Sequence, residues 1–154
     1  MTSPTTPLPS PSRSVSPAPS DPAPAEGYAG DIAPALAWQW VQIGRAVLVD
    51  VRTDAEREWV GRVPGAVAVP WKQWPGMVPN AAFDADLRAA VPPGCVAVLL
   101  CRSGVRSIAA ARRATELGLV AYNILEGFEG DPNAAGHRGQ RGGWRLQGLP
   151  WVQS

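Results

Sequence analysis

Short runs of apolar residues recur along the chain, and their lengths indicate β-strands rather than helices. The runs span residues 46–51, 67–69, 95–101 and 122–125. The first and third are apolar at nearly every position, which is typical of a strand buried on both faces of a sheet. We therefore expect these four segments to form strands of a central sheet.

The segments between these runs have the patterns of helices. Pro34 suits the first turn of a helix, and residues 53–56 have the spacing of a capping box. Residues 80–90 have a helical composition, and an Ala- and Arg-rich segment over 105–117 stops at Gly118. Buried strands that alternate with helices predict an α/β fold with a mainly parallel central sheet.

The start of the chain differs in composition from the rest. Residues 1–26 are mostly Pro, Ser, Thr and Ala and contain almost no large apolar side chain. Such a segment cannot bury enough surface to offset the entropy lost on ordering, so we expect a disordered tail followed by one domain over 27–154. The tail lacks the basic start and the apolar run of a secretory signal, and we therefore expect a cytoplasmic protein.

Charge and ligand content exclude several classes of function. The net charge of the 154 residues is +1, which gives no broad positive field for nucleic acid or an anionic membrane. The sequence has no run of about 18 apolar residues that could span a bilayer. Two Cys and one His cannot supply a four-ligand Cys/His zinc site. We expect no metal and no cofactor, and the remaining candidates are thiol- or carboxylate-based sites.

Cys101 ends the third apolar run, and a short Gly-containing loop then leads into the Ala- and Arg-rich helix. This arrangement directs backbone N–H groups and the positive end of a helix toward one point. The point lies at the carboxyl edge of a parallel sheet, where binding sites gather. A thiolate is stabilised in such a place, so Cys101 is a candidate nucleophile. Arg102 and Arg106 add positive charge to the same loop.

Cys95 lies at the opposite end of the same run and has no basic loop beside it. We interpret Cys95 as a core residue, because free cysteines are common in protein interiors. Six steps along an extended strand separate Cys95 from Cys101 by about 20 Å, which is too far for a disulfide.

Motifs in a fixed order along the chain resemble those of the rhodanese-like sulfurtransferases. Residues 101–107, Cys-Arg-Ser-Gly-Val-Arg-Ser, resemble the active-site loop of that family, and residues 50–52 resemble its Asp-x-Arg strand end. Residues 61–66 resemble a His-Ile-Pro-Gly-Ala turn, with Arg62 in place of the usual His. Residues 125–128 resemble a Leu-x-Gly-Gly segment. Each motif is weak alone, but together and in this order they are specific.

The resemblance covers residues 30–154, and residues 143–150 resemble the end of the family pattern. Residues 129–142 are longer and richer in Gly than the minimal pattern. The resemblance implies a rhodanese-like fold, with helices on both sides of the sheet, and a single-domain sulfurtransferase. A sulfane-sulfur donor such as thiosulfate would load Cys101 as a persulfide, and a thiol or cyanide acceptor would remove the sulfur.

The family motif also assigns the residues around the nucleophile. Carried over residue by residue, the loop and substrate-binding positions are Arg102, Ser103, Gly104, Val105 and Arg106. The loop N–H groups would hold the persulfide, and the two arginines would orient an anionic donor. Two supporting residues beside the site, Asp50 and Arg52, form either a structural ion pair or a contact to substrate.

Loop length separates this hypothesis from a phosphatase. Protein phosphatases and related arsenate reductases use Cys-x5-Arg, whereas Cys101 and Arg106 give Cys-x4-Arg. The shorter loop should fit a sulfur atom better than a phosphate. Two alternatives stay open: a persulfide carrier that serves a protein partner, and a non-catalytic binding module of the same fold.

Overall fold

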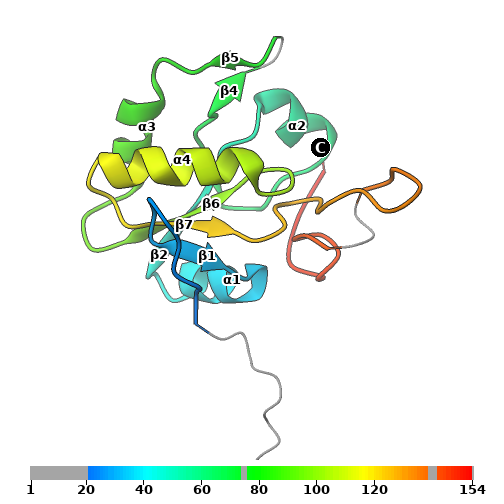
Figure 1. The fold of residues 1–154 in the computed structure, drawn as a ribbon, viewed down its shortest axis with the longest axis horizontal. Coiled ribbons are helices and arrows are strands. Elements are labelled where there is room, and N and C mark those ends of the chain that lie inside the picture. Colours follow the sequence, from blue (N-terminus) through cyan, green and yellow to red (C-terminus); the bar gives the residue numbers. More distant parts are fainter. Residues whose placement is uncertain (1–20, 74–75, 139–141, 154) are drawn as a thin grey trace, which may run out of the picture.

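The computed structural model describes residues 21–73, 76–138 and 142–153, which fold around a five-stranded sheet (Figure 1). In chain order the elements are β1 (Gly30–Ile32), α1 (Pro34–Gln42), β2 (Ala46–Asp50), α2 (Asp54–Trp59), β3 (Val67–Ala68), β4 (Lys72–Gln73), β5 (Val78–Pro79), α3 (Phe83–Ala90), β6 (Val96–Leu100), α4 (Val105–Glu116) and β7 (Ala121–Ile124). The sheet has the order β1-β7-β6-β2-β3, and its four pairings are parallel. The expected α/β fold with a parallel central sheet is confirmed.

The four expected strands correspond to β2, β3, β6 and β7, whereas the sequence analysis missed three strands. Strand β1 has only three residues, Gly-Asp-Ile, which is too short for an apolar run to be recognised. Strands β4 and β5 have two residues each and form a separate antiparallel pair. Of these strands, β1 lies closest to the argument about the site, because its Asp31 side chain is hydrogen-bonded to Asn123 of β7.

The expected starts of α2 and α4 are confirmed by their local chemistry. Thr53 Oγ1 accepts from the Glu56 N–H at 3.1 Å, and Glu56 Oε1 accepts from the Thr53 N–H at 3.1 Å, which closes the capping box of α2. Helix α4 begins after Gly104, whose φ of 116° lies in the region that favours glycine. None of the helices in the described part of the chain is both long enough and apolar enough to cross a membrane.

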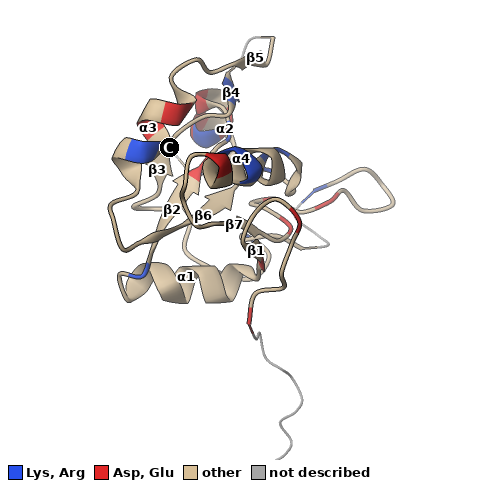
Figure 2. Ribbon diagram, turned by 60° about the vertical axis from the view of Figure 1, so that its left-hand side comes forward, with Lys and Arg blue, Asp and Glu red and all other residues tan. Residues whose placement is uncertain are grey.

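Helices cover both faces of the sheet, as expected. Helix α1 lies on one face, and α3 and α4 lie on the other (Figure 1). Alternate residues of β6 therefore enter different cores: Val98 and Leu100 pack on the α1 side, whereas Ala97, Leu99 and the following Cys101 face α3 and α4. Helix α1 carries no charged residue, while α2, α3 and α4 carry several (Figure 2).

The expected tail, residues 1–26, lies mostly outside the described residues. Its last six residues are described, and Ala23 forms an antiparallel bridge with Asp31. The Ala23 N–H donates to the Asp31 carbonyl at 2.9 Å, and the Asp31 N–H donates back at 2.8 Å. The packed part of the chain therefore begins before residue 27, because this segment pairs with the backbone of β1, an edge strand that offers unpaired backbone groups.

Candidate active site

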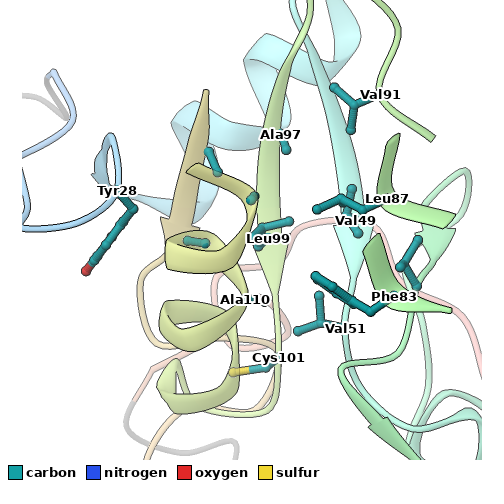
Figure 3. Packing of buried hydrophobic residues seen from close by; sticks show 14 residues of the cluster. Tyr28, Val49, Val51, Phe83, Leu87, Val91, Ala97, Leu99, Cys101 and Ala110 are labelled. Carbon is teal, nitrogen blue, oxygen red and sulfur yellow. The ribbon is translucent and has the colours of Figure 1, made fainter. Parts of the chain in front are cut away.

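Cys101 lies directly after β6, and its sulfur points toward the first turn of α4 (Figure 3). The residue is only 1% exposed. The Gly104 N–H donates to Cys101 Sγ at 3.0 Å, and Ser107 Oγ lies 3.2 Å from the same sulfur. Gly104 is the N-cap of the twelve-residue helix α4, so the positive end of the helix faces the sulfur. A backbone N–H and the start of a helix thus both face the Cys101 sulfur, which is the arrangement expected from the sequence.

The segment after β7 holds the loop from behind. The Phe128 N–H donates to the Cys101 carbonyl at 2.7 Å, and the Glu129 N–H donates to the Arg102 carbonyl at 2.9 Å. Gly127 passes so close that a Cβ on it would lie 2.5 Å from the Cys101 carbonyl oxygen. The glycine in the 125–128 motif is therefore required by the close approach of two backbone segments.

Arg106 extends across the loop to Glu56 on α2. Its Nη1 and Nη2 donate to the two carboxylate oxygens of Glu56 at 2.6 and 2.7 Å, and both side chains are largely buried. The hydrogen bond with Glu56 raises the pKa of Arg106 above its usual value, against an opposing effect of burial. Arg106 thus binds another part of the protein, rather than standing free for a donor.

The same pair changes the ionisation of Glu56. Burial acts to raise the pKa of Glu56, but the hydrogen bond and the attraction from Arg106, together with the bonds from Thr53, outweigh burial and lower this pKa to about 2. Glu56 is therefore a carboxylate at neutral pH. The sequence analysis assigned no part in the site to Glu56. Its position in a capping box gave no signal of this second role.

Two adjoining pockets open at the loop. One, of about 260 Å³, is lined by Cys101, Arg102, Ser103, Val105 and Arg106. The other, of about 390 Å³, is lined by Thr53, Ala55, Glu56, Met77, Arg102 and Arg106. Arg102 and Arg106 border both pockets. In the described ranges of the chain no acidic side chain forms an ion pair with Arg102, which makes Arg102 the loop cation open to a ligand.

Asp50 and Arg52 form a buried ion pair beside the loop. Arg52 Nε and Nη2 donate to the Asp50 carboxylate at 2.9 and 2.7 Å, and both residues are 0% exposed. Arg52 Nη2 also donates to the Gly61 carbonyl at 2.7 Å, and its guanidinium lies 4.2 Å from the ring centroid of Phe128. Of the two roles left open by the sequence, the geometry favours the structural one, because the pair joins three segments around the site.

Ser107 and Asn123 are polar residues of the site to which the sequence analysis gave no role. Ser107 Oγ lies between Cys101 Sγ and Asn123 Oδ1. A signal for Asn123 was available, because a polar residue within a buried strand requires a hydrogen-bonding partner.

Cys95 lies at the amino end of β6, far along the strand from Cys101, and both cysteines are free thiols. The expectation of a core position holds only in part. Cys95 packs against the core but is only half-buried. Across the described residues, no group of three or more His, Cys, Asp or Glu side chains could hold a metal ion.

Comparisons with known proteins give a consistent result. Residues 33–131 match the Rhodanese-like domain. A protein of Rickettsia conorii, described as uncharacterized, is 36% identical over 111 residues, which cover 69% of this chain and 82% of that protein. The crystal structure of Rv0390 from M. tuberculosis is 47% identical with a TM-score of 0.75, and the match covers 82% of this chain and 99% of that one.

A rhodanese-related protein from Thermoplasma volcanium, at 19% identity, has a similar fold with a TM-score of 0.52 over 79% of this chain and 96% of that one. The family match spans well over half of the chain and includes β6, the loop that follows Cys101, helix α4 and strand β7. The chain therefore belongs to the rhodanese-like family.

Proposed function

We propose that this protein is a sulfurtransferase that carries sulfane sulfur on Cys101 as a persulfide. The observation that carries the proposal is the Gly104 N–H, which donates to Cys101 Sγ at 3.0 Å from the start of α4. Such a donor stabilises negative charge on sulfur without any rearrangement of the loop during the reaction. The small pocket over Cys101 leaves room for one more sulfur atom.

The first half-reaction loads the protein. Cys101 loses its proton, and the thiolate attacks the outer sulfur of a donor such as thiosulfate. A new S–S bond forms to Cys101, the S–S bond of thiosulfate breaks, and its electron pair leaves with sulfite. The negative charge then rests on the outer sulfur of the persulfide.

The second half-reaction removes the outer sulfur from the Cys101 persulfide. A thiolate or cyanide attacks the outer sulfur, and the bond to Cys101 breaks with its electron pair on the cysteine thiolate. The products are an acceptor persulfide or thiocyanate and the original protein. Arg102 is the cation placed to attract an anionic donor, while Arg106 holds the loop against α2 through Glu56.

Intact mass measurement tests this proposal. Incubation with thiosulfate and desalting should add the mass of one sulfur atom, peptide mapping should place it on Cys101, and cyanide should remove it. A Cys95→Ser variant should behave like the wild type, and a Cys101→Ser variant should take up no sulfur. Turnover of thiosulfate and cyanide without sulfur on Cys101 would contradict the covalent mechanism.

A second candidate is a persulfide carrier that passes its sulfur to a protein partner. It is favoured by apolar side chains at the mouth of the site: Val105 is 76% exposed at the start of α4, and Met77 and Val78 are exposed beside the larger pocket. A carrier would gain sulfur from a donor but discharge it poorly to cyanide or small thiols. Either role fits the cytoplasm, where thiols remain reduced.

A further inference from the structure

A chain of side-chain hydrogen bonds connects Cys101 to the edge of the sheet. Ser107 Oγ lies 3.2 Å from Cys101 Sγ and 2.5 Å from Asn123 Oδ1. Asn123 Nδ2 lies 3.0 Å from Asp31 Oδ1, which also accepts from the Tyr28 hydroxyl at 2.8 Å. The chain runs from the loop after β6, past β7, to the edge strand β1. The proposed sulfur transfer makes no use of these contacts.

Elementary chemistry fixes the direction of each bond. The Asp31 carboxylate can only accept, so the Asn123 amide must turn its NH₂ group toward Asp31 and its oxygen toward Ser107. Ser107 has one hydroxyl proton, and the Asn123 oxygen receives it. What remains for Cys101 is a lone pair on Ser107 Oγ, which can accept from a thiol S–H but cannot stabilise a thiolate.

We propose that Asn123, held in this orientation by Asp31, positions the Ser107 proton away from Cys101 and thereby controls how readily Cys101 ionises. A thiolate would attract the Ser107 hydroxyl, but if that proton turned to sulfur the Asn123 oxygen would lose its donor. Asn123 is 2% exposed and Ser107 is 0% exposed, so little room remains for water to take the place of that donor. An unpaired buried acceptor is costly. The row of hydrogen bonds from Ser107 to Asp31 therefore opposes the ionisation of the resting Cys101 thiol, which the start of α4 favours.

The loaded protein would not meet this opposition. In a persulfide the negative charge lies on the outer sulfur, and Sγ has neither a proton nor a charge. Ser107 can then keep its bond to Asn123 while the outer sulfur is held by the loop. The row of hydrogen bonds from Ser107 to Asp31 would thus favour the Cys101 persulfide over the free Cys101 thiolate. This consequence rests on the proposed function, whereas the control of ionisation does not.

The other charged groups near the loop are separable from this chain. Arg106 is paired with Glu56 from α2, and Arg52 is paired with Asp50 at the end of β2. After β7, Glu129 lies 3.9 Å from Arg145, and Glu126 accepts from a backbone N–H. Arg102 is exposed in the loop itself. None of these groups contacts Asp31 or Asn123, so a variant on β1 leaves them in place.

Asp31→Asn tests the proposal from a distance, because Asp31 has no contact with Cys101. An asparagine at this position can donate, which lets the Asn123 amide turn over, give an N–H to Ser107 and release the hydroxyl proton toward Cys101. The measurement is the rate of Cys101 alkylation by iodoacetamide as a function of pH, on the full chain, with peptide mass spectrometry to distinguish Cys101 from Cys95. We expect the midpoint of this curve to move about one pH unit lower, the effect of one hydrogen bond to a charged group.

Two matched variants make the result specific. Tyr28→Phe removes the other donor to Asp31 but leaves the carboxylate an acceptor, so the midpoint should not move. Adding Asp31→Asn to Ser107→Ala should leave the midpoint of the Ser107→Ala protein unchanged, because the proton that moves is absent. Asn123→Leu, which removes the amide oxygen, should lower the midpoint as Asp31→Asn does.

An unchanged midpoint in both folded Asp31→Asn and folded Asn123→Leu would overturn the proposal. An equal shift with and without the Ser107 hydroxyl would also overturn it, because loss of the Asp31 charge would then be sufficient. Alkylation involves no sulfur donor, so this result stands apart from the outcome of the persulfide test.

Discussion

The two ends of the central strands carry the same residue types in opposite circumstances. Strand β6 has Cys95 just before its amino end and Cys101 just after its carboxyl end. Cys95 is half-buried and donates a long hydrogen bond, 3.6 Å, to the Gly44 carbonyl, whereas Cys101 is buried against the start of a helix. In a parallel sheet the helices begin at the carboxyl edge. One end of the strand therefore faces the start of a helix, and the other end does not.

Strand β2 shows the same contrast with arginines. Arg45 precedes the strand and Arg52 follows it, and each guanidinium lies over an aromatic ring, Trp40 at 4.1 Å and Phe128 at 4.2 Å. Arg45 is exposed, but Arg52 is buried with Asp50. The carboxyl edge thus contains buried charges whose loss should be costly, and the amino edge contains solvated ones.

The largest effect should come from replacing each cysteine in turn by serine and comparing the sulfur-transfer activity of the two variants. Cys101→Ser should abolish sulfur transfer from thiosulfate to cyanide, since a serine hydroxyl cannot form the persulfide. Cys95→Ser should retain most of the activity, because no helix start faces Cys95. Steady-state assays on both purified variants, with circular dichroism as the check on folding, measure the difference. An inactive but folded Cys95→Ser protein would contradict the assignment of the two cysteines.

The arginine comparison predicts the next largest effect, on stability. Arg52→Leu leaves the Asp50 carboxylate buried with its main partner gone, and should lower the free energy of unfolding by about 3–5 kcal/mol. Arg45→Leu should lower it by no more than about 1 kcal/mol, the size of an exposed cation–π contact. Urea unfolding of both variants gives these values. Similar losses of unfolding free energy in Arg52→Leu and Arg45→Leu would show that burial of the Asp50–Arg52 pair does not add to stability.

Much of the fold could be predicted because it depends on local pattern. The apolar runs identified β2 and β6, and the order Cys-Arg-Ser-Gly before a helix located the loop. Strand β1 escaped because three residues contain no periodicity. The pairing of Arg106 with Glu56 escaped for another reason: the two residues are 50 positions apart, and no local rule specifies which loop cation meets which helix cap.

For Asn123, part of its role could have been predicted from the sequence. Its position in a buried strand predicts a polar partner, but the partners come from α4 and β1, which only the topology brings together. The place of Cys101 in a loop between a buried strand and a helix could be predicted from the sequence, whereas the side chains that connect its sulfur to β1 could not.

Acid should expose a further difference between the two edges. The pKa of Glu56 is lowered to about 2 in the folded protein from an ordinary 4.5, so the unfolded chain binds the proton more readily between these values. The resulting stability is fully present above about pH 4.5 and is lost as the pH falls toward 2. Wild type should exceed Glu56→Gln in unfolding free energy by on the order of 2–3 kcal/mol near pH 6, and this excess should shrink steadily in acid.

Glu116 supplies the control for this prediction. It pairs with Arg113 at the carboxyl end of α4, on the amino edge of the sheet, and its side chain is mostly exposed. Glu116→Gln should change the unfolding free energy by less than about 1 kcal/mol across the same pH range. A glutamine at position 56 can keep the Thr53 bonds of the capping box. A loss of unfolding free energy in Glu56→Gln that does not depend on pH would therefore mean that Arg106 contributes nothing through its charge.

The smallest predicted effect separates the two cations of the loop. Arg102 is open to the pocket, so Arg102→Ala should lower kcat/KM more for thiosulfate than for benzenethiosulfonate, which carries one negative charge fewer. Expressed as transition-state stabilisation, the loss should be larger for thiosulfate by about 1–2 kcal/mol. Arg106 is held by Glu56, and Arg106→Ala should lower kcat/KM for the two donors equally, because the loop loses its connection to α2. Arg88, which lies beside Cys95 at the amino edge, provides the matched variant, and Arg88→Ala should change neither donor. If Arg106→Ala discriminates between the donors and Arg102→Ala does not, Arg106 leaves Glu56 to bind the donor, and the open cation of the site has been assigned to the wrong residue.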